Sequence, residues 1–281
     1  MSKSKILVIG SSGMVGSSLV NILRNAGHSV RETTSRKDNT ADGKDRVFLN
    51  LVTGENLHAA FDGIERAFLL SPPGFADQYS MLSPLIQEAK RRGLKKVVLM
   101  TAMGANAVET APFRRAELEL ESSGLNYNII RPNWFLQNFN TFWVHGIKQD
   151  NLIALPAGQA KVSFIDARDI SEVAAKLLTS DKWNNKDFDL TGPVAVDHKE
   201  VGEAIGKTIG RPIAYKDIAP EVLKSGLVGA GLPVDYVDFM IMIFGFLKEG
   251  YNARTTAAVK EIIGRDPLSL ADYVKANKAA W

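Results

Sequence analysis

The sequence contains no cysteine, and this absence removes disulfide bonds and thiolate metal sites from the chemistry open to it. Its four histidines show no His-x-x-x-His spacing, so we expect no metal site. A chain without cysteine suits a reducing compartment. We therefore expect a cytoplasmic protein that binds no metal.

Strong charge and long apolar runs are also lacking. The 34 Lys and Arg against 31 Asp and Glu leave a net charge of +3, too small a field to favour nucleic acid or a membrane surface. No apolar run reaches the ~18 residues that a membrane-spanning helix needs. The nearest, residues 239–247, lies between Asp238 and Lys248. The N-terminus shows no signal-peptide core. From the small net charge and the lack of a long apolar run, we expect neither nucleic-acid nor membrane binding.

Short apolar runs do alternate with longer amphipathic stretches over the first two thirds of the chain. This alternation predicts strands that alternate with helices. The expected strands span residues 5–9, 29–34, 47–50, 66–70, 96–101 and 126–131, and the expected helices span 14–26, 55–61, 77–92 and 113–122. Strands and helices in this order build a doubly wound parallel sheet, the Rossmann class of α/β fold.

The regular alternation ends near Asn184. Beyond it, Gly-Pro, Gly-x-Pro and Asp-Pro turns separate shorter helical segments. We expect residues 1–183 to form an NAD(P)-binding Rossmann domain. Residues 184–281 would form a smaller, mainly helical substrate lobe that packs on the first domain or interleaves with it. Asp169 followed by Glu172 predicts a capping box that opens a helix over 170–179.

A glycine-rich loop follows the first expected strand and opens the first expected helix. One glycine permits the tight turn, another lets backbone N–H groups approach a pyrophosphate, and the third lets helix and strand pack closely. The phosphates then lie at the helix N-terminus, where unpaired N–H groups and the helix dipole favour an anion. The loop predicts a dinucleotide cofactor, with a glycine-rich turn without ligand as the alternative. The candidate contacts are Gly10, Ser11, Ser12, Gly13, Met14, Val15 and Gly16.

The end of the second expected strand bears on the choice of cofactor. A protein selective for NAD places Asp or Glu there to bind the adenosine ribose, whereas this chain has Ser35, Arg36 and Lys37. A guanidinium can bind a 2′-phosphate through two hydrogen bonds, and Lys37 adds charge. We therefore expect NADP(H) to be preferred over NAD(H), unless Arg36 and Lys37 are only a solvated pair in a loop.

With these motifs in view, the chain resembles the NmrA-like branch of the atypical short-chain dehydrogenases, and within it the azoreductase and triphenylmethane reductase group. The Gly-x-x-Gly-x-x-Gly spacing of the loop is one match. The other matching stretches are residues 49–51, 70–73, 123–125, 130–135, 161–170 and 264–274. The resemblance spans nearly the full length and implies an NAD(P)(H)-binding Rossmann protein.

The resemblance also implies where the cofactor lies. Each implied contact falls in a loop after a strand, which is where doubly wound sheets bind ligands. The implied contacts are Asn50 and Leu51 near the adenine, Leu70, Ser71 and Pro72 near the ribose, Thr101, Ala102 and Met103 along the nicotinamide, and Pro132, Asn133 and Trp134 beside it.

The chain departs from ordinary short-chain dehydrogenases in its catalytic residues. Those enzymes use a Tyr-x-x-x-Lys pair, in which the ammonium lowers the phenol pKa for proton transfer. No tyrosine here has a lysine four residues later, and the corresponding positions hold Glu109 and Phe113. We therefore assign no catalytic residue.

An acceptor that takes hydride directly, such as a quinone, an azo bond or a triphenylmethane cation, would not need that pair. The expected pocket for such a substrate is aromatic and comprises Phe75, Trp134, Phe135 and Phe139. Asn133 and Gln137 would either orient a carbonyl or carboxamide or cap loops. Residues 239–247 would pack in the core or in a homodimer, or form a lid.

Two functions remain open at this point. The first is an NADP(H)-dependent oxidoreductase acting on a small hydrophobic substrate. The second is a non-enzymatic sensor of the NADP(H) redox state that presents its surface to a protein partner, as some NmrA-like proteins do. A sugar-nucleotide epimerase is disfavoured, because it needs the missing Tyr-x-x-x-Lys pair.

Overall fold

The computed structural model describes residues 5–40 and 45–281. Contacts between backbone segments divide the chain into two compact units. Unit 1 comprises Met1–Pro73, Asp77–Pro132 and Ile170–Asp189, and unit 2 comprises Gly74–Ala76, Asn133–Asp169 and Leu190–Trp281. The chain therefore passes from one unit to the other several times. Whether 1–183 and 184–281 behave as separate domains stays a prediction.

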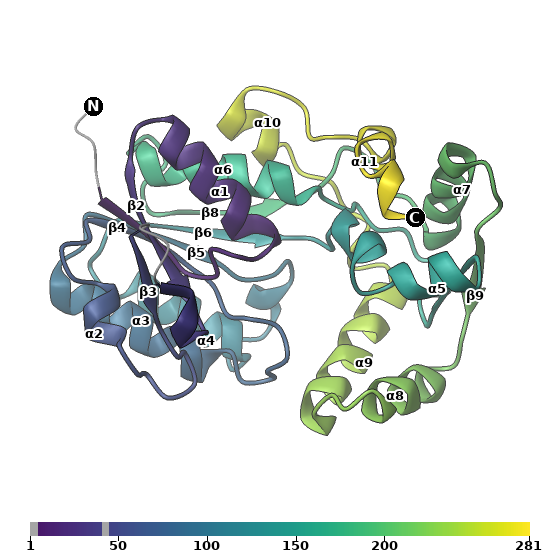
Figure 1. Cartoon of the computed structure of the whole chain (residues 1–281), viewed down its shortest axis with the longest axis horizontal. Coiled ribbons are helices and arrows are strands. Elements are labelled where there is room, and N and C mark those ends of the chain that lie inside the picture. The colour runs from purple at the N-terminus through teal and green to yellow at the C-terminus, as the bar shows by residue number, and fades with distance from the viewer. Residues whose placement is uncertain (1–4, 41–44) are drawn as a thin grey trace. The chain divides into compact units, whose positions relative to one another are not determined.

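Unit 1 is built on a seven-stranded sheet with the order β3-β2-β1-β4-β5-β6-β8 (Figure 1). Its strands are β1 (Lys5–Val8), β2 (Ser29–Thr34), β3 (Arg46–Phe48), β4 (Arg66–Leu69), β5 (Lys96–Met100), β6 (Tyr127–Pro132) and β8 (Lys186–Leu190). Neighbouring strands from β3 to β6 pair in parallel. The doubly wound Rossmann class is confirmed.

The strand order reverses between β1 and β4, the third and fourth strands of the sheet. After β1 the chain forms β2 and β3 on one side of β1. After β4 it forms β5 and β6 on the opposite side of the sheet. Ligands of doubly wound sheets bind at the carboxyl ends of the strands at this switch point. Ile6, Leu7 and Val8 of β1 are fully buried, as expected for a strand covered on both faces.

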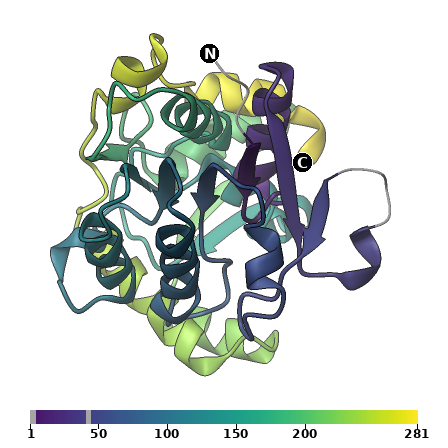
Figure 2. The same cartoon turned by 90° about the vertical axis from the view of Figure 1, so that its left-hand side faces the viewer.

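Helices cover both faces of the sheet. In Figures 1 and 2, α1 (Met14–Asn25) and α6 (Ala167–Thr179) lie over one face, and α2 (Leu57–Ala60), α3 (Tyr79–Arg92) and α4 (Pro112–Glu121) over the other. The Ser171 hydroxyl of α6 donates a hydrogen bond to the Val15 carbonyl of α1 at 2.9 Å. Short 3-10 turns span Lys37–Thr40, Ala105–Ala107, Leu136–Asn140 and Lys278–Ala280.

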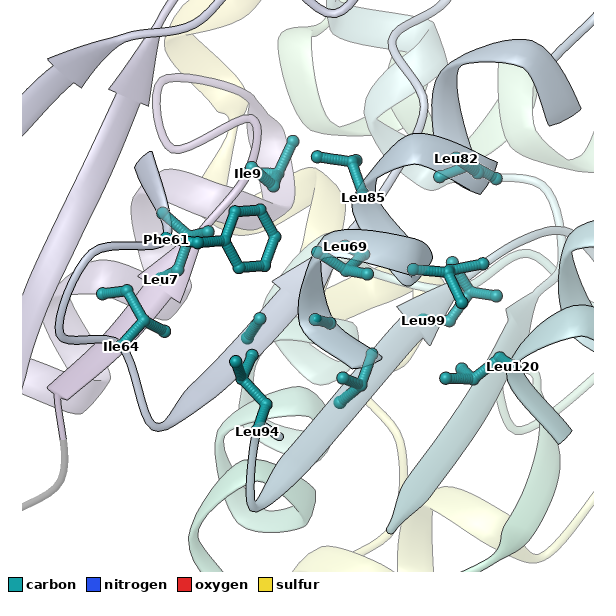
Figure 3. Close-up of a cluster of buried hydrophobic side chains, with 14 of the residues drawn as sticks. Leu7, Ile9, Phe61, Ile64, Leu69, Leu82, Leu85, Leu94, Leu99 and Leu120 are labelled. Carbon is teal, nitrogen blue, oxygen red and sulfur yellow. The ribbon is translucent and has the colours of Figure 1, made fainter. Parts of the chain in front are cut away.

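One hydrophobic core of unit 1 lies between the sheet and the helices α3 and α4 (Figure 3). Leucines of neighbouring strands meet leucines of these two helices there. The cluster includes Leu7, Leu69 and Leu99 from the strands and Leu82, Leu85 and Leu120 from the helices. This packing fixes the strand ends from which the candidate site is built.

Unit 2 has its own small sheet and its own core. The sheet pairs β7 (Leu152–Leu155) with β9 (Ala214–Asp217) in parallel. Its helices are α5 (Val144–Gln149), α7 (His198–Ile209), α8 (Pro220–Gly229), α9 (Val234–Lys248), α10 (Ala258–Ile263) and α11 (Leu270–Ala276). The core gathers Phe139, Phe164, Phe244 and Tyr273.

The predicted capping box at Asp169 is wrong. The helix α6 begins at Ala167, three residues before the expected start, and the Asp166 carboxylate accepts the Arg168 N–H at 2.9 Å. Asp169 lies inside the first turn, where its carboxylate accepts the Leu268 N–H at 2.8 Å and pairs with Arg265 at 2.7 Å. The Asp166 carboxylate thus satisfies the Arg168 N–H at this helix start, and Asp169 anchors a distant segment.

Candidate functional site

Close contacts of the backbone explain the glycines of the loop after β1. Gly10 has φ of +69°, and a Cβ there would lie 2.9 Å from the Leu70 side chain. A Cβ on Gly16 would lie 2.1 Å from the Gly10 carbonyl oxygen. The Gly13 N–H donates to that same oxygen at 2.9 Å. The loop therefore needs glycine for a left-handed turn at Gly10 and for close packing of the helix at Gly16.

The loop presents the N-terminus of α1. Gly13 is the residue that precedes α1, so no side chain caps the first turn, and that turn contains no acidic residue. The first N–H groups of a helix have no partner within the helix and carry partial positive charge. This end of α1 has the chemistry of an anion site.

The two serines of the loop differ in their roles. The Ser11 hydroxyl is buried and donates to the Thr33 carbonyl at 2.9 Å, while the Thr33 hydroxyl donates to the Val8 carbonyl at 3.3 Å. These bonds tie the loop to the end of β2. Ser12 is exposed beside Gly13, so its hydroxyl remains available to a ligand.

The end of β2 presents exposed cations. Ser35, Arg36 and Lys37 are all exposed. Lys37 pairs with Glu55 at 2.7 Å and lies over the Phe48 ring. No partner of the Arg36 guanidinium is found within residues 5–40 and 45–281. Arg36 is therefore the cation at this strand end that is free to bind a ligand.

Glu32, a carboxylate within β2, is committed elsewhere. It is buried and forms ion pairs with Arg24 at 2.7 Å and with Arg46 at 2.9 Å. Burial alone would raise its pKa, but the hydrogen bonds from the two guanidiniums hold the pKa below its ordinary value. Glu32 thus stays ionised, and the two arginines balance its negative charge. It therefore does not repel a phosphate near Arg36.

The loops after β3 and β4 are held by local hydrogen bonds. The Asn50 side-chain oxygen accepts the N–H groups of Val52 and Thr53 at 2.9 and 3.2 Å, which closes a tight turn. Leu51 is half-buried. The Leu70 side chain packs on Gly10, and the Ser71 hydroxyl donates to the Pro72 carbonyl at 3.2 Å. Both loops thus have a fixed shape without a ligand.

A buried ion pair lies at the carboxyl ends of β5 and β6. Arg131 donates from Nε and Nη2 to the two carboxylate oxygens of Glu117, each at 2.8 Å. The Thr101 hydroxyl donates to the same carboxylate at 2.6 Å. The Met103 N–H donates to the Pro132 carbonyl at 3.0 Å, which joins the two loops that follow these strands. The Thr101 hydroxyl proton is therefore already used in a hydrogen bond within the protein.

Further charges surround this pair. Arg131 also contacts Asp187, and Arg114 bridges Glu117 and Glu121 at 3.0 and 2.7 Å. Burial alone would lower the pKa of Arg131, but the carboxylates around it raise the pKa, so it remains charged. The sequence offered one signal for Glu117, a carboxylate between apolar neighbours on a helix. Its partner, fourteen positions away, had no signal.

The two positions that the sequence resemblance assigned to the usual Tyr and Lys hold neither a phenol nor an ammonium. Glu109 is exposed, and Phe113 packs against the core of unit 1. The pKa-lowering ammonium of the ordinary enzymes therefore has no counterpart at these two positions.

In unit 2 the side-chain amide of Asn133 is buried, and both its nitrogen and its oxygen have hydrogen-bond partners. Its nitrogen donates to the Ser163 hydroxyl at 2.8 Å and to the Asn252 carbonyl at 2.9 Å. Its oxygen accepts the Trp134 N–H and the Asn252 amide, both at 2.9 Å. The Gln137 amide likewise bonds Asp166 and the Ala167 N–H. Both amides thus act in holding loops, the second of the two roles considered for them.

The aromatic residues expected to line a pocket lie in different surroundings. Trp134 is half-buried, with its ring centroid 4.9 Å from that of Phe244. Phe135 is half-buried and Phe75 is 39% exposed. Phe139 has no accessible surface and packs edge-on against Trp143 and Phe164. The structure corrects the prediction for Phe139, which belongs to the core of unit 2.

Two other kinds of site are absent from the described ranges 5–40 and 45–281. Those residues contain no group of three or more His, Asp or Glu side chains placed to hold a metal ion. None of their helices has the length and apolar character needed to cross a membrane.

Comparison with known proteins shows the family of this chain. The model of the NmrA-like family matches residues 2–274. This chain belongs to the NmrA-like family. The chain is 31% identical over 282 residues to the oxidoreductase YesF of Bacillus subtilis (strain 168), covering 100% of this chain and 98% of YesF. It is also 31% identical over 284 residues to the NAD(P)H azoreductase of Xenophilus azovorans, covering 98% and 99% of the two chains.

Solved structures with the same fold include a complex with a cofactor. The triphenylmethane reductase of Citrobacter sp. complexed with NADP(H) superposes with a TM-score of 0.83. The two chains are 18% identical, and the match covers 96% of this chain and 99% of the other. At this identity the likeness shows the shared fold.

Proposed function

We propose that this protein is an NADP(H)-dependent reductase that transfers hydride to a small hydrophobic, aromatic acceptor such as a quinone, an azo compound or a triphenylmethane dye. The observation that carries the proposal is the loop from Gly10 to Gly16. Its shape requires glycine at positions 10 and 16, because a side chain there would clash with neighbouring atoms. The loop presents an uncapped helix N-terminus at the switch point of the sheet. Membership of the NmrA-like family and the named reductases among its relatives support it.

The cofactor would follow the carboxyl ends of the strands of unit 1. Its pyrophosphate would lie at the N-terminus of α1, where the N–H groups and the Ser12 hydroxyl are available. The remaining proposed contacts are those of the strand-end loops, namely Ser35, Arg36, Lys37, Asn50, Leu51, Leu70, Ser71, Pro72, Thr101, Ala102, Met103, Pro132, Asn133 and Trp134. For Asn133, whose amide is used within the protein, the backbone would make the contact.

A preference for NADP(H) over NAD(H) is part of the proposal. Arg36 is exposed and free of protein partners in the described chain, so its guanidinium can bind a 2′-phosphate. Glu32 is held by two arginines and does not repel that phosphate. Lys37 would add positive charge, although its ion pair with Glu55 lessens its attraction for the phosphate.

The acceptor would meet an aromatic surface. When bound, NADPH supplies the hydride, and the residues of this chain would orient the acceptor and exclude water. Phe75, Trp134 and Phe135 have accessible surface and follow the loops proposed to bind the ribose and the nicotinamide. A flat aromatic acceptor would stack on such rings.

Turnover tests this proposal. Purified protein would be mixed with NADPH and with a quinone, an azo dye and a triphenylmethane dye in turn, and the nicotinamide absorbance would be followed. We expect oxidation of NADPH with at least one acceptor. Tight NADPH binding without turnover of any acceptor would contradict the enzyme and favour the sensor, whose partner would be another protein. A homodimer stays a prediction for size measurements in solution.

A further inference from the structure

An ion pair joins the end of β2 to the loop that follows β3. The Lys37 ammonium lies 2.7 Å from the Glu55 carboxylate, and both residues belong to unit 1. Lys37 is the first residue of the 3-10 turn after β2, and Glu55 lies two residues before α2. Their side chains are 69% and 48% exposed, so a ligand in solution can reach both members of the pair.

Hydrogen bonds of the loop after β3 hold the backbone of Glu55 in place. Its carbonyl accepts the Asn50 N–H at 3.2 Å, and its own N–H donates to the Thr53 hydroxyl at 3.3 Å. The Gly54 N–H donates to the Asn50 carbonyl at 2.9 Å, and Gly54 has φ of +72°. This closed turn keeps the Glu55 carboxylate within reach of Lys37.

A second contact of Lys37 leaves its charge intact. The Lys37 ammonium lies over the Phe48 ring, 5.0 Å from its centre. Phe48 ends β3 and is buried, so the ring is a fixed surface beneath the ammonium. An aromatic face attracts a cation but carries no net charge to balance it. Of these two contacts, only the one with Glu55 offsets the positive charge of Lys37.

The pair lies beside the proposed site of the 2′-phosphate. Arg36 directly precedes Lys37, so their Cα atoms are about 3.8 Å apart. The Arg36 N–H donates to the Thr34 hydroxyl at 3.1 Å, which fixes the turn at the end of β2. A phosphate monoester carries about −1.5 to −2 charges at pH 7. A phosphate bound at this strand end therefore meets a lysine that is already paired with another anion, Glu55.

We propose that Glu55 sets the cofactor selectivity of this protein by competing with the 2′-phosphate for the Lys37 ammonium. The inference rests on the proposed function, which places that phosphate at the end of β2. Lys37 binds the phosphate only by sharing its charge with Glu55 or by leaving it. NADH has a hydroxyl in place of the phosphate, so this competition does not affect it. Glu55 thus holds the preference for NADP(H) below the value that Arg36 and Lys37 would give together.

Glu55→Gln removes the charge and keeps the size of the side chain. Dissociation constants for NADPH and NADH would be measured by nicotinamide fluorescence at low salt. We expect NADPH to bind about three- to tenfold more tightly, the scale of one exposed ion pair, and NADH to bind as before. Raising the salt to roughly 0.5 M should shrink the gain, because salt screens exposed charges. A residue that only shaped the loop would weaken both cofactors when changed.

Three further variants test whether Glu55 acts through Lys37. Glu55→Asp keeps the carboxylate and should bind NADPH as the unchanged protein does. In a Lys37→Met background, Glu55→Gln should bring no gain, since the contested ammonium is gone. Glu65→Gln is the matched control, because Glu65 pairs with Lys95 at 2.6 Å at the amino ends of β4 and β5. It should change neither affinity, since the proposed cofactor contacts lie at the carboxyl ends of the strands.

The other outcomes separate this inference from the proposed function. Unchanged NADPH affinity in Glu55→Gln, or an equal gain for NADH, would contradict the competition. A full gain in the Lys37→Met background would also contradict it, because Glu55 would then repel the phosphate directly. If Arg36→Ala weakens NADPH while Glu55→Gln changes nothing, the phosphate site stands and only the inference fails.

Turnover is not needed for these measurements. A protein that binds NADPH but reduces no acceptor would overturn the proposed reductase, while the affinities of the Glu55 variants would still decide the inference. Binding of neither cofactor by the unchanged protein would overturn both.

Discussion

Arg131 and Glu117 form a two-point ion pair in which the side chains are 2% and 0% exposed. Two parallel hydrogen bonds of 2.8 Å join the guanidinium to the carboxylate. The pair connects the last residues of β6 to α4, and the Thr101 hydroxyl connects it to the end of β5. The strand ends proposed to face the nicotinamide are thus held by one buried carboxylate.

Glu117→Gln should strongly destabilise the protein. The change leaves Arg131 charged and buried with only part of its compensation, and breaking a buried ion pair costs about 3–5 kcal/mol. Because Asp187 and Asp189 remain near Arg131, we expect a loss of about 3 kcal/mol in the free energy of unfolding, measured with urea.

Glu109→Gln is the control for this measurement, because Glu109 is exposed. It should change the free energy of unfolding by no more than about 0.5 kcal/mol. A loss below about 1 kcal/mol in Glu117→Gln would show that the two aspartates replace the missing charge.

Gly16→Ala should damage the cofactor loop. The added Cβ would lie 2.1 Å from the Gly10 carbonyl oxygen, so α1 or the loop must move away and the N–H groups proposed to bind the pyrophosphate move with it. We expect NADPH affinity to fall at least about tenfold, the equivalent of about 1.4 kcal/mol, when measured by calorimetry.

Gly226→Ala provides the comparison for the glycine change. Gly226 lies inside α8, and a Cβ there meets nothing within 4 Å. Alanine is favoured over glycine in a helix by about 0.5–1 kcal/mol, so this variant should bind NADPH normally and unfold no more easily. Normal NADPH binding by Gly16→Ala would remove the loop from the proposed site.

The sequence could predict the parts of the fold that depend on neighbouring residues. Strand, glycine loop and helix follow one another around Gly10, so local pattern sufficed, and the doubly wound sheet followed from the alternation of strands and helices. The Glu117–Arg131 pair could not be predicted, because packing of α4 against β6 decides which charges meet. Phe139 was assigned to a pocket because aromatic residues near a strand end do not reveal which of them face the core.

Arg36→Ala should weaken NADPH much more than NADH. The guanidinium would form charge-assisted bonds to the 2′-phosphate, which NADH lacks, and such bonds contribute about 1.5–3 kcal/mol. We expect NADPH affinity to fall roughly 10- to 100-fold and NADH affinity to stay nearly constant, as measured by titration of nicotinamide fluorescence.

Lys37→Ala serves as the graded control, because its ammonium is already paired with Glu55. It should weaken NADPH less than Arg36→Ala does. Equal losses of NADPH and NADH affinity in Arg36→Ala would mean that the phosphate site lies elsewhere.

His198 should make the protein less stable in mild acid. Its ring has no accessible surface, and neither ring nitrogen has a hydrogen-bond partner among residues 5–40 and 45–281. The rings around it are those of Phe139, Trp143, Phe164 and Tyr215. Burial lowers its pKa from 6.5 to about 4, although the charge of Asp197 acts in the opposite direction. The folded protein therefore disfavours the charged ring.

The sign of the pH effect follows from these two pKa values. Above pH 6.5 the ring is neutral in both folded and unfolded chains, so its full contribution to stability is present. As the pH falls from 6.5 towards 4, the unfolded chain binds the proton first and stability is lost. The loss attributable to His198 should reach about 2 kcal/mol between pH 7.5 and pH 5.

Urea unfolding of His198→Phe across this pH range isolates the contribution from that of the carboxylates. The variant should lose about 2 kcal/mol less than the unchanged protein between pH 7.5 and pH 5, because phenylalanine does not titrate. His145→Leu is the control, since His145 is exposed, and it should lose as much as the unchanged protein. If His198→Phe and the unchanged protein lose the same free energy over this range, His198 takes up its proton as easily in the folded chain as in the unfolded one. The aromatic residues around it would then not exclude the charge.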